Sequence, residues 1–226
     1  MKLRINGFEN EIRLIQNHAN VIQIRNPKLL SHFIEVLNEK INDIDNNEIV
    51  LLDENNQELN FSKKVYLLID VFNIDFNSKK ILNKIYDLIS NNIDVEQGNF
   101  INSINNNIKK KLINEINELP FSFNLKDSID SYDLLKMYNV RIDIFSYTNP
   151  LNKIELLIEI LSILKIADIL IIPNLKSYLS EEELLELYKY GMYNNINIIL
   201  LESRRWKKIN YEKIIYIDEE FDEFLT

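Results

Sequence analysis

Apolar residues in the second half of the chain follow the pattern of a strand, a helix and a second strand. The apolar runs ADILIIP (167–173) and NINIILL (195–201) have the length of buried strands. Between them, SYLSEEELLELYKYG (177–191) has helical periodicity and a capping signal at its start. The pattern therefore predicts a strand-helix-strand unit of an open parallel sheet.

The same alternation of strands and helices runs through most of the chain. The segments LRI and EIRLIQ (11–16) flank Asn6-Gly7, a turn signal that predicts an N-terminal hairpin. One helix is expected after Asn26-Pro27, with proline in its first turn, and another after Asn77-Ser78. The remaining predicted elements are the strands VIQIR (21–25), EIVLLD (48–53), VYLLID (65–70) and RIDIF (141–145), and a helix from Pro150 to about Ile166.

A long helical stretch interrupts this alternation. Apolar residues recur there at intervals of four, which predicts one long amphipathic helix that stops at Pro120. The recurring residues are Phe100, Ile104, Ile108, Leu112 and Ile116. A second helix near 129–138 is expected to pack back against the first. We therefore predict an α/β sheet domain at 1–90 and 139–226, with a helical subdomain inserted at 91–138.

The composition limits the chemistry of the chain. Its 226 residues include 26 Lys+Arg and 35 Asp+Glu, and a net charge of -9 argues against a protein that coats nucleic acid over its whole surface. Cysteine is absent, which excludes disulfides and thiolate metal sites. The N-terminal segment lacks the apolar core of a signal peptide, and charged residues break the longest apolar run, 154–172. A soluble, cytoplasmic protein without membrane association is expected.

The glycines do not form a phosphate-binding loop. The chain has three, Gly7, Gly98 and Gly191, and none lies between a predicted strand and a helix. After VIQIR, where such a loop is expected, the sequence is Arg25-Asn26-Pro27-Lys28, and proline removes one of the amides that would face phosphate. The motifs GxSxG and HExxH are also absent. ATP binding by the usual loop is therefore not expected.

Charged residues at the ends of predicted strands are candidates for a site at the carboxyl edge of the sheet. Arg204-Arg205 follow the strand at 195–201, and paired guanidinium groups at such an edge favour an anion, often phosphate. The carboxylates Asp70 and Glu202 also lie at strand ends, and they could form the divalent-metal site of a nuclease.

The inserted region contains a lysine run and an acidic cluster. Lys109-Lys110-Lys111 sweeps round a helix, so at least one lysine must point away from the apolar stripe, and Lys63-Lys64 forms a second basic edge. An ordinary solvated face is the simpler interpretation of such runs. The acidic cluster offers the oxygen ligands that calcium prefers, without the spacing of an EF-hand. Its members are Glu115, Glu118, Asp127, Asp130 and Asp133.

Three segments of the chain resemble the short form of the Csn2 family, which comprises adaptation proteins of type II-A CRISPR systems. They are VIQIRNPKLLSHFIEVL, LLIDVFNIDFNSKKILNKIYDLI and INIILLESRRWKKINYEKIIYID. The last contains Arg204-Arg205, which matches a double arginine typical of the family near its C-terminus. The resemblance runs over nearly the full length of the chain.

The resemblance implies a non-catalytic protein that binds the ends of double-stranded DNA. Csn2 proteins are similar to a degenerate P-loop-type α/β domain with a helical insertion. They form a homotetramer, a ring whose lysine-lined hole accepts linear duplex and whose architecture calcium supports. They act with Cas1, Cas2 and Cas9 when new spacers are acquired. An acidic outside and a basic lining would let a chain of net charge -9 hold phosphates without sequence readout.

The resemblance also suggests roles for individual residues. The acidic cluster lies where family members place calcium-binding carboxylates, although Lys126 stands beside Asp127 here. Arg204 and Arg205 are expected either to contact DNA or to brace the sheet domain through a carboxylate such as Asp70. Two other functions stay open: a metal-dependent nuclease, and a protein-protein adaptor of the Cas acquisition complex. From local charge alone, the candidates for DNA contact are Lys28, Lys63, Lys64, Lys109, Lys110 and Lys111.

Overall fold

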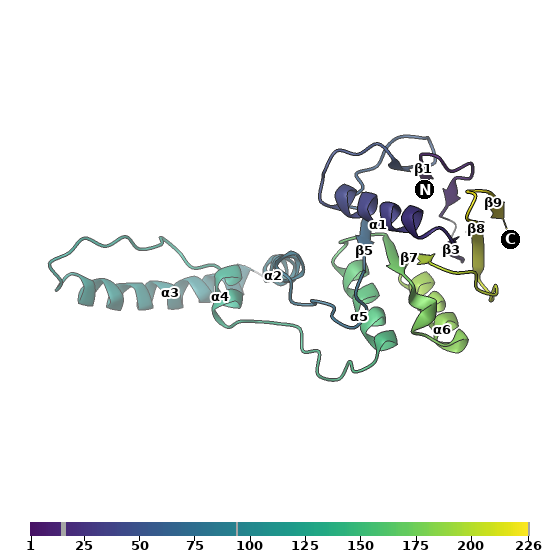
Figure 1. Ribbon diagram of the computed structural model, residues 1–226. Helices are drawn as coiled ribbons and strands as arrows, with labels where there is room; N and C mark the ends of the chain where they lie inside the picture. Colours follow the sequence, from purple (N-terminus) through teal and green to yellow (C-terminus); the bar gives the residue numbers. More distant parts are fainter. Residues whose placement is uncertain (15–16, 94, 226) are drawn as a thin grey trace. The chain divides into compact units, whose positions relative to one another are not determined.

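The computed structural model describes residues 1–14, 17–93 and 95–225, and the chain divides into two compact units (Figure 1). We call Met1–Asp75 with Phe145–Thr226 the sheet unit, and Phe76–Ile144 the helical unit. The helical unit is longer at both ends than the predicted insertion at 91–138. It includes the helix α2 (Lys79–Asn92), whose Tyr86 Oη donates a hydrogen bond to the carbonyl oxygen of Val140 in the same unit at 2.8 Å.

The described residues of the sheet unit form a six-stranded sheet in the order β5-β6-β7-β3-β8-β9. The first five strands are parallel, and β9 pairs with β8 in the antiparallel direction. All residues of β3 and β6 are buried, which is the pattern of parallel strands covered on both faces. The strands are β3 (Ala19–Ile24), β5 (Val65–Leu67), β6 (Ile169–Pro173), β7 (Asn197–Glu202), β8 (Glu212–Ile217) and β9 (Glu223–Leu225).

Helices cover both faces of this sheet, with α1 (Pro27–Ile41) on one face and α5 (Pro150–Ile163) and α6 (Glu181–Tyr193) on the other (Figure 1). Each begins at a polar cap: the Asn26 side chain accepts hydrogen bonds from two backbone amides of α1, and Ser180 forms a capping box with Glu183. A short 3-10 helix, η1 (Leu175–Ser177), links β6 to α6. The predicted fold class, a mostly parallel α/β sheet with an inserted helical region, is confirmed.

A second, antiparallel sheet has the order β2-β1-β4 and contains the N-terminal hairpin. Its strands are β1 (Lys2–Ile5), β2 (Ile12–Arg13) and β4 (Ile49–Leu52). The loop between β1 and β2 is longer than a tight two-residue turn, and Gly7 adopts a φ of 87° in it. The end of the predicted strand EIRLIQ, residues 15–16, lies outside the described residues.

The helical unit contains α2, the long α3 (Val95–Ile116) and the short α4 (Ser131–Met137). The prediction that the second helix packs against the long one is wrong, because α4 packs mainly on α2. The rings of Tyr86 and Tyr132 meet edge to face at 5.5 Å, and Tyr132 Oη donates to Asn83 Oδ1 at 2.8 Å. Much of the apolar stripe of α3 is therefore exposed in the single chain. Phe100, for example, has 67% of its surface accessible to solvent.

The predicted strand RIDIF (141–145) is also wrong, because the segment is irregular up to Ile144. The Asn77 amide replaces a strand partner there: its Oδ1 accepts from the Ile142 amide at 2.8 Å, and its Nδ2 donates to the Ile142 carbonyl at 3.2 Å. The alternating pattern thus belongs to an irregular segment that pairs with a side chain and not with a strand. None of the helices in the described ranges is long and apolar enough to cross a membrane.

Candidate nucleic-acid interface

The loop that follows β7 concentrates positive charge at the carboxyl edge of the sheet. We call Ser203–Tyr211 the basic loop; it contains Arg204, Arg205, Lys207 and Lys208, all exposed. None of these four cations forms an ion pair with another described residue. Their charges are therefore available to an external anion.

Aromatic rings support the two arginines, and no carboxylate in the described part of the chain pairs with them. The guanidinium carbon of Arg204 lies 4.2 Å from the centroid of the Trp206 ring, and Arg204 Nη2 donates to Ser177 Oγ at 3.2 Å. The guanidinium carbon of Arg205 lies 4.9 Å from the centroid of Tyr216. A guanidinium that rests on a ring face keeps most of its in-plane N–H donors free for an oxyanion.

The structure does not form the brace that was considered between these arginines and Asp70. The Asp70 carboxylate instead closes its own turn: Oδ1 accepts from the amide of Phe72 at 2.9 Å, and Oδ2 accepts from Asn73 Nδ2 at 2.7 Å. The hydrogen bond from the Asn73 side chain is the largest cause that lowers the pKa of Asp70. A local turn, which needs no long-range partner, thus occupies this carboxylate.

A buried carboxylate, Glu202, holds the start of the basic loop. Glu202 is fully buried at the end of β7; its Oε1 accepts from the Lys176 amide and its Oε2 from Trp206 Nε1, both at 3.0 Å. Burial raises the pKa of Glu202 to about 7, although these two donors partly oppose the shift. Gln23 Nε2 also donates to the Trp206 carbonyl at 3.2 Å, so Trp206 is fixed by its ring and its backbone.

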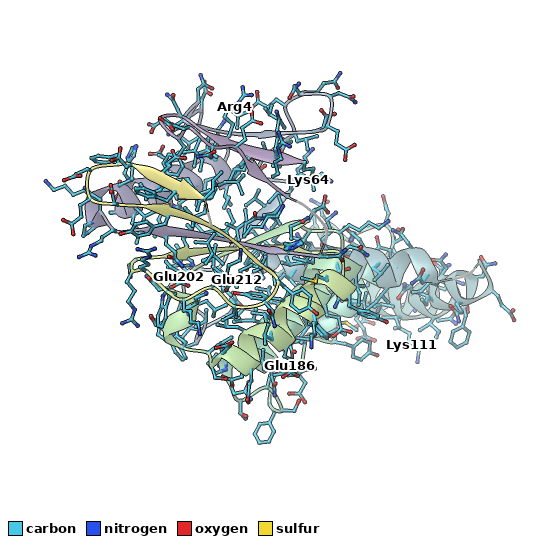
Figure 2. All side chains as sticks on the ribbon, turned by 90° about the vertical axis from the view of Figure 1, so that its right-hand side faces the viewer. Arg4, Lys64, Lys111, Glu186, Glu202 and Glu212 are labelled. Atoms are coloured by element: carbon cyan, nitrogen blue, oxygen red, sulfur yellow. The ribbon has the colours of Figure 1, made fainter. Side chains whose placement is uncertain are left out.

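A second buried carboxylate, Glu212, holds the end of the same loop. Its Oε2 accepts from the Ile209 amide at 3.0 Å. Its Oε1 lies 2.6 Å from Lys176 Nζ and accepts from Tyr188 Oη at 2.7 Å. Both side chains of the ion pair with Lys176 are almost completely buried, 3% exposed for the lysine and 0% for the glutamate. Figure 2 labels Glu202 and Glu212, and besides burial the charge of Glu212 is one of the causes that raise the pKa of Glu202.

These contacts bear on the nuclease alternative. Glu202 has no exposed surface, and its two oxygens already accept hydrogen bonds. Asp70 is exposed and closes a separate turn. Within the described ranges, Asp70 and Glu202 do not belong to a group of carboxylates close enough to share a metal ion. The arrangement around Glu202 is that of a structural carboxylate.

The predicted DNA-contact lysines fall into one set on each unit. In the sheet unit, Lys28 and Lys63 are exposed, whereas Lys64 Nζ lies 2.5 Å from Asp168 Oδ2. In the helical unit, Lys110 and Lys111 are exposed. Lys109 Nζ in the helical unit donates to the carbonyl of Asp127 at 2.9 Å and lies 3.8 Å from its Oδ1. Lys64 and Lys109 are therefore less available for phosphate than the other four.

The predicted calcium ligands are not gathered into one group in the described part of the chain. Asp130 and Asp133 form the capping box of α4, and Asp133 also pairs with Lys126. The bond from Lys126 is the largest cause that lowers the pKa of Asp133. Glu115 and Glu118 are exposed near the end of α3. The spacing of Asp130 and Asp133 is itself a capping signal that the interpretation as a metal site missed.

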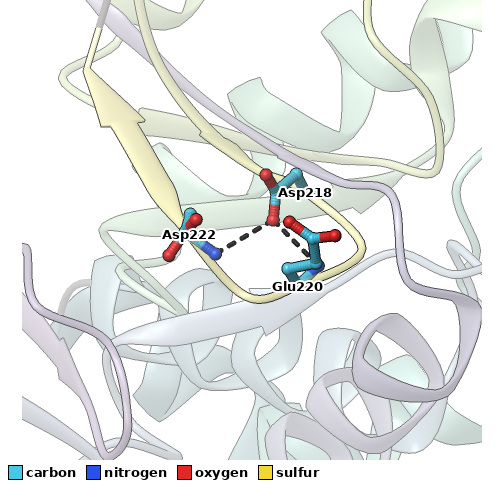
Figure 3. Close-up of side chains that lie close together, drawn as sticks. All are labelled: Asp218, Glu220 and Asp222. Atoms are coloured by element: carbon cyan, nitrogen blue, oxygen red, sulfur yellow. Dashed lines mark hydrogen bonds between the residues drawn. The ribbon is translucent and has the colours of Figure 1, made fainter.

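The turn between β8 and β9 brings together three carboxylates that sequence reasoning did not select. Oxygens of Asp218, Glu220 and Asp222 lie within 4.8 Å of one another (Figure 3). Asp218 Oδ1 accepts from the amides of Glu220 at 2.9 Å and Asp222 at 3.0 Å. The geometry of this turn is therefore enough to explain why the three groups are close.

Comparison with known proteins relates the chain to a protein family and to solved structures. A family model described as CRISPR-associated protein (Cas_Csn2) matches residues 42–221. Among solved structures, the crystal structure of Stu0660 of Streptococcus thermophilus is similar, with a TM-score of 0.63 and 17% sequence identity over 96% of this chain and 74% of that chain. A search of curated proteins gave no match. At this identity the structural similarity concerns the fold.

Proposed function

Because the chain belongs to the CRISPR-associated Csn2 family, we propose that it binds the ends of double-stranded DNA during spacer acquisition, without cutting the DNA or reading its sequence. In this proposal it acts in the cytoplasm with Cas1, Cas2 and Cas9. The observation that supports DNA binding most directly is a set of exposed cations without ion-pair partners among the described residues. They are Lys28, Lys63, Lys110, Lys111, Arg204 and Arg205.

The junction between β3 and α1 supports a role without nucleotide hydrolysis. In a nucleotide-binding α/β protein, the first amides of this helix would face phosphate. Here Asn26 Oδ1 accepts from the amides of Lys28 at 3.0 Å and Leu29 at 3.2 Å. Pro27 has no amide proton to donate. The Asn26 side chain thus occupies two of the amide donors that a phosphate would need.

Binding to linear and closed DNA tests the proposed function. Gel shifts should show binding to linear duplex that weakens about 10³-fold between 50 and 200 mM salt, as expected for roughly six phosphate contacts. A covalently closed circle of the same sequence should bind much more weakly, because a ring can thread only onto a free end. Equal binding to both forms would contradict end recognition.

A cleavage assay tests the nuclease alternative. With magnesium or manganese added, the linear duplex should stay intact, and cleavage of the duplex would support a nuclease instead.

The exposed apolar stripe of α3 supports the proposed assembly into a homotetramer. Phe100, Ile108 and Leu112 are about half exposed or more, and such a stripe is costly to leave in water. Light scattering with calcium should give about 108 kDa, four times the 26.9 kDa chain, and chelation of calcium should lower that mass. Ile108→Asp should dissociate the assembly, whereas Asn107→Asp, its exposed neighbour, should not. A monomer with or without calcium would contradict the ring.

A further inference from the structure

We propose that the basic loop is a preformed site for DNA backbone phosphates on the sheet unit, with Arg204 and Arg205 as its contact residues. The inference rests on the proposed function and adds the element of the sheet unit that touches DNA. The loop has four exposed cations within five positions, Arg204, Arg205, Lys207 and Lys208, and none of them is neutralised by a described carboxylate.

The backbone of the loop is ordered by contacts at three regularly spaced residues. The Ser203 amide donates to Asn174 Oδ1 at 3.0 Å, the Trp206 carbonyl accepts from Gln23, and the Ile209 amide donates to Glu212. Asn174, Gln23 and Glu212 thus fix the loop without an anion. A loop that is already ordered loses less conformational entropy when it binds, so more of its electrostatic attraction becomes affinity.

The placement of the guanidinium groups favours a polyanion over a single small anion. Arg204 rests on Trp206 within the loop, and Arg205 rests on Tyr216 of β8. Because each arginine has its own aromatic support, each can donate in-plane hydrogen bonds to a separate phosphate. The Trp206 indole already donates to Glu202 and carries a guanidinium on its ring, so its role is to support Arg204. Contacts of these arginines with phosphates would hold the DNA backbone without reading its sequence.

The test compares Arg204→Gln/Arg205→Gln with Lys165→Gln/Lys189→Gln. Both double variants remove two exposed positive charges from the sheet unit, so they change the net charge equally. We expect the arginine variant to bind linear duplex at least about tenfold more weakly at 100 mM salt. Its slope of log affinity against log salt should shrink by about 1.8, or 0.9 for each lost phosphate contact. The lysine variant should bind like the unmodified protein.

Trp206 supplies a second, local readout, because it is the single tryptophan of the chain. Saturating duplex should change its emission in the unmodified protein and in the lysine variant, and much less in the arginine variant. If the two double variants bind equally and the emission does not respond to bound DNA, the loop is not the site and DNA binding occurs elsewhere. If the unmodified protein binds no linear duplex at all, the proposed function fails and this inference fails with it.

Discussion

Replacement of Lys176 by methionine should lower the free energy of unfolding of the sheet unit by about 3 to 5 kcal/mol. The lysine ammonium lies 2.6 Å from the Glu212 carboxylate, and both side chains are removed from water. Without the lysine, the negative charge of Glu212 stays buried, and among the described residues the Tyr188 hydroxyl and the Ile209 amide are the donors left to stabilise it. Thermal unfolding followed by circular dichroism should show a midpoint roughly 6 to 20 °C lower.

A double variant separates the loss of the ion pair from the loss of packing. Lys176→Met/Glu212→Gln removes both charges, so most of the lost stability should return, because neutral partners do not leave a buried charge unpaired. Lys165→Met serves as the control, since Lys165 is exposed and should change the midpoint little. If Lys176→Met unfolds at the temperature of the unmodified protein, the buried ion pair does not form in solution.

The parts of the fold that the sequence predicts well are those with local causes. The apolar run at 167–173 and the cap at Asn26 act within a few residues, and the structure has a strand and a helix start at these places. Sheet membership is not local: EIVLLD (48–53) reads as one more strand, yet β4 pairs with β1 in the second sheet. RIDIF (141–145) alternates like a strand, but its partner is the Asn77 side chain.

The candidate site shows the same division between local and distant causes. Arg204 and Arg205 are visible in the sequence as cations after a strand, and their exposure agrees with that interpretation. Their supports are less visible, because Tyr216 becomes a partner only after the chain returns in β8. The pairing of Lys64 with Asp168 joins residues 104 positions apart, so no local pattern could remove Lys64 from the list of free lysines.

Glu202 should make the sheet unit less stable as the pH rises from about 5 to 8. Burial raises its pKa to about 7 in the folded chain, above the ordinary value of 4.5. Below pH 4.5 the group is neutral in both states, so its stabilising contribution is complete there, and it is lost as the pH rises through 7. A difference of about 2.5 pKa units corresponds to roughly 3 kcal/mol. Urea unfolding at several pH values measures this loss.

The difference between the unmodified protein and Glu202→Gln isolates this contribution, because the glutamine has no charge to bury. Carboxylates whose pKa is lowered, such as Asp70 and Asp133, lose their stabilising effect only as the pH falls below the ordinary range, and both proteins contain them. The stability difference should therefore change by about 3 kcal/mol between pH 5 and 8, in the direction that favours the variant at high pH. Glu54→Gln, at an exposed turn, should give a curve parallel to that of the unmodified protein.

The emission of Trp206 should report the same ionisation in the folded protein. Trp206 Nε1 donates to Glu202 Oε2 at 3.0 Å, so the charge on that carboxylate sits directly at the indole. A midpoint near pH 7 is expected, and Glu202→Gln should abolish it. A flat emission profile, together with parallel unfolding curves, would show that Glu202 keeps one charge state across this range and that burial does not control its ionisation.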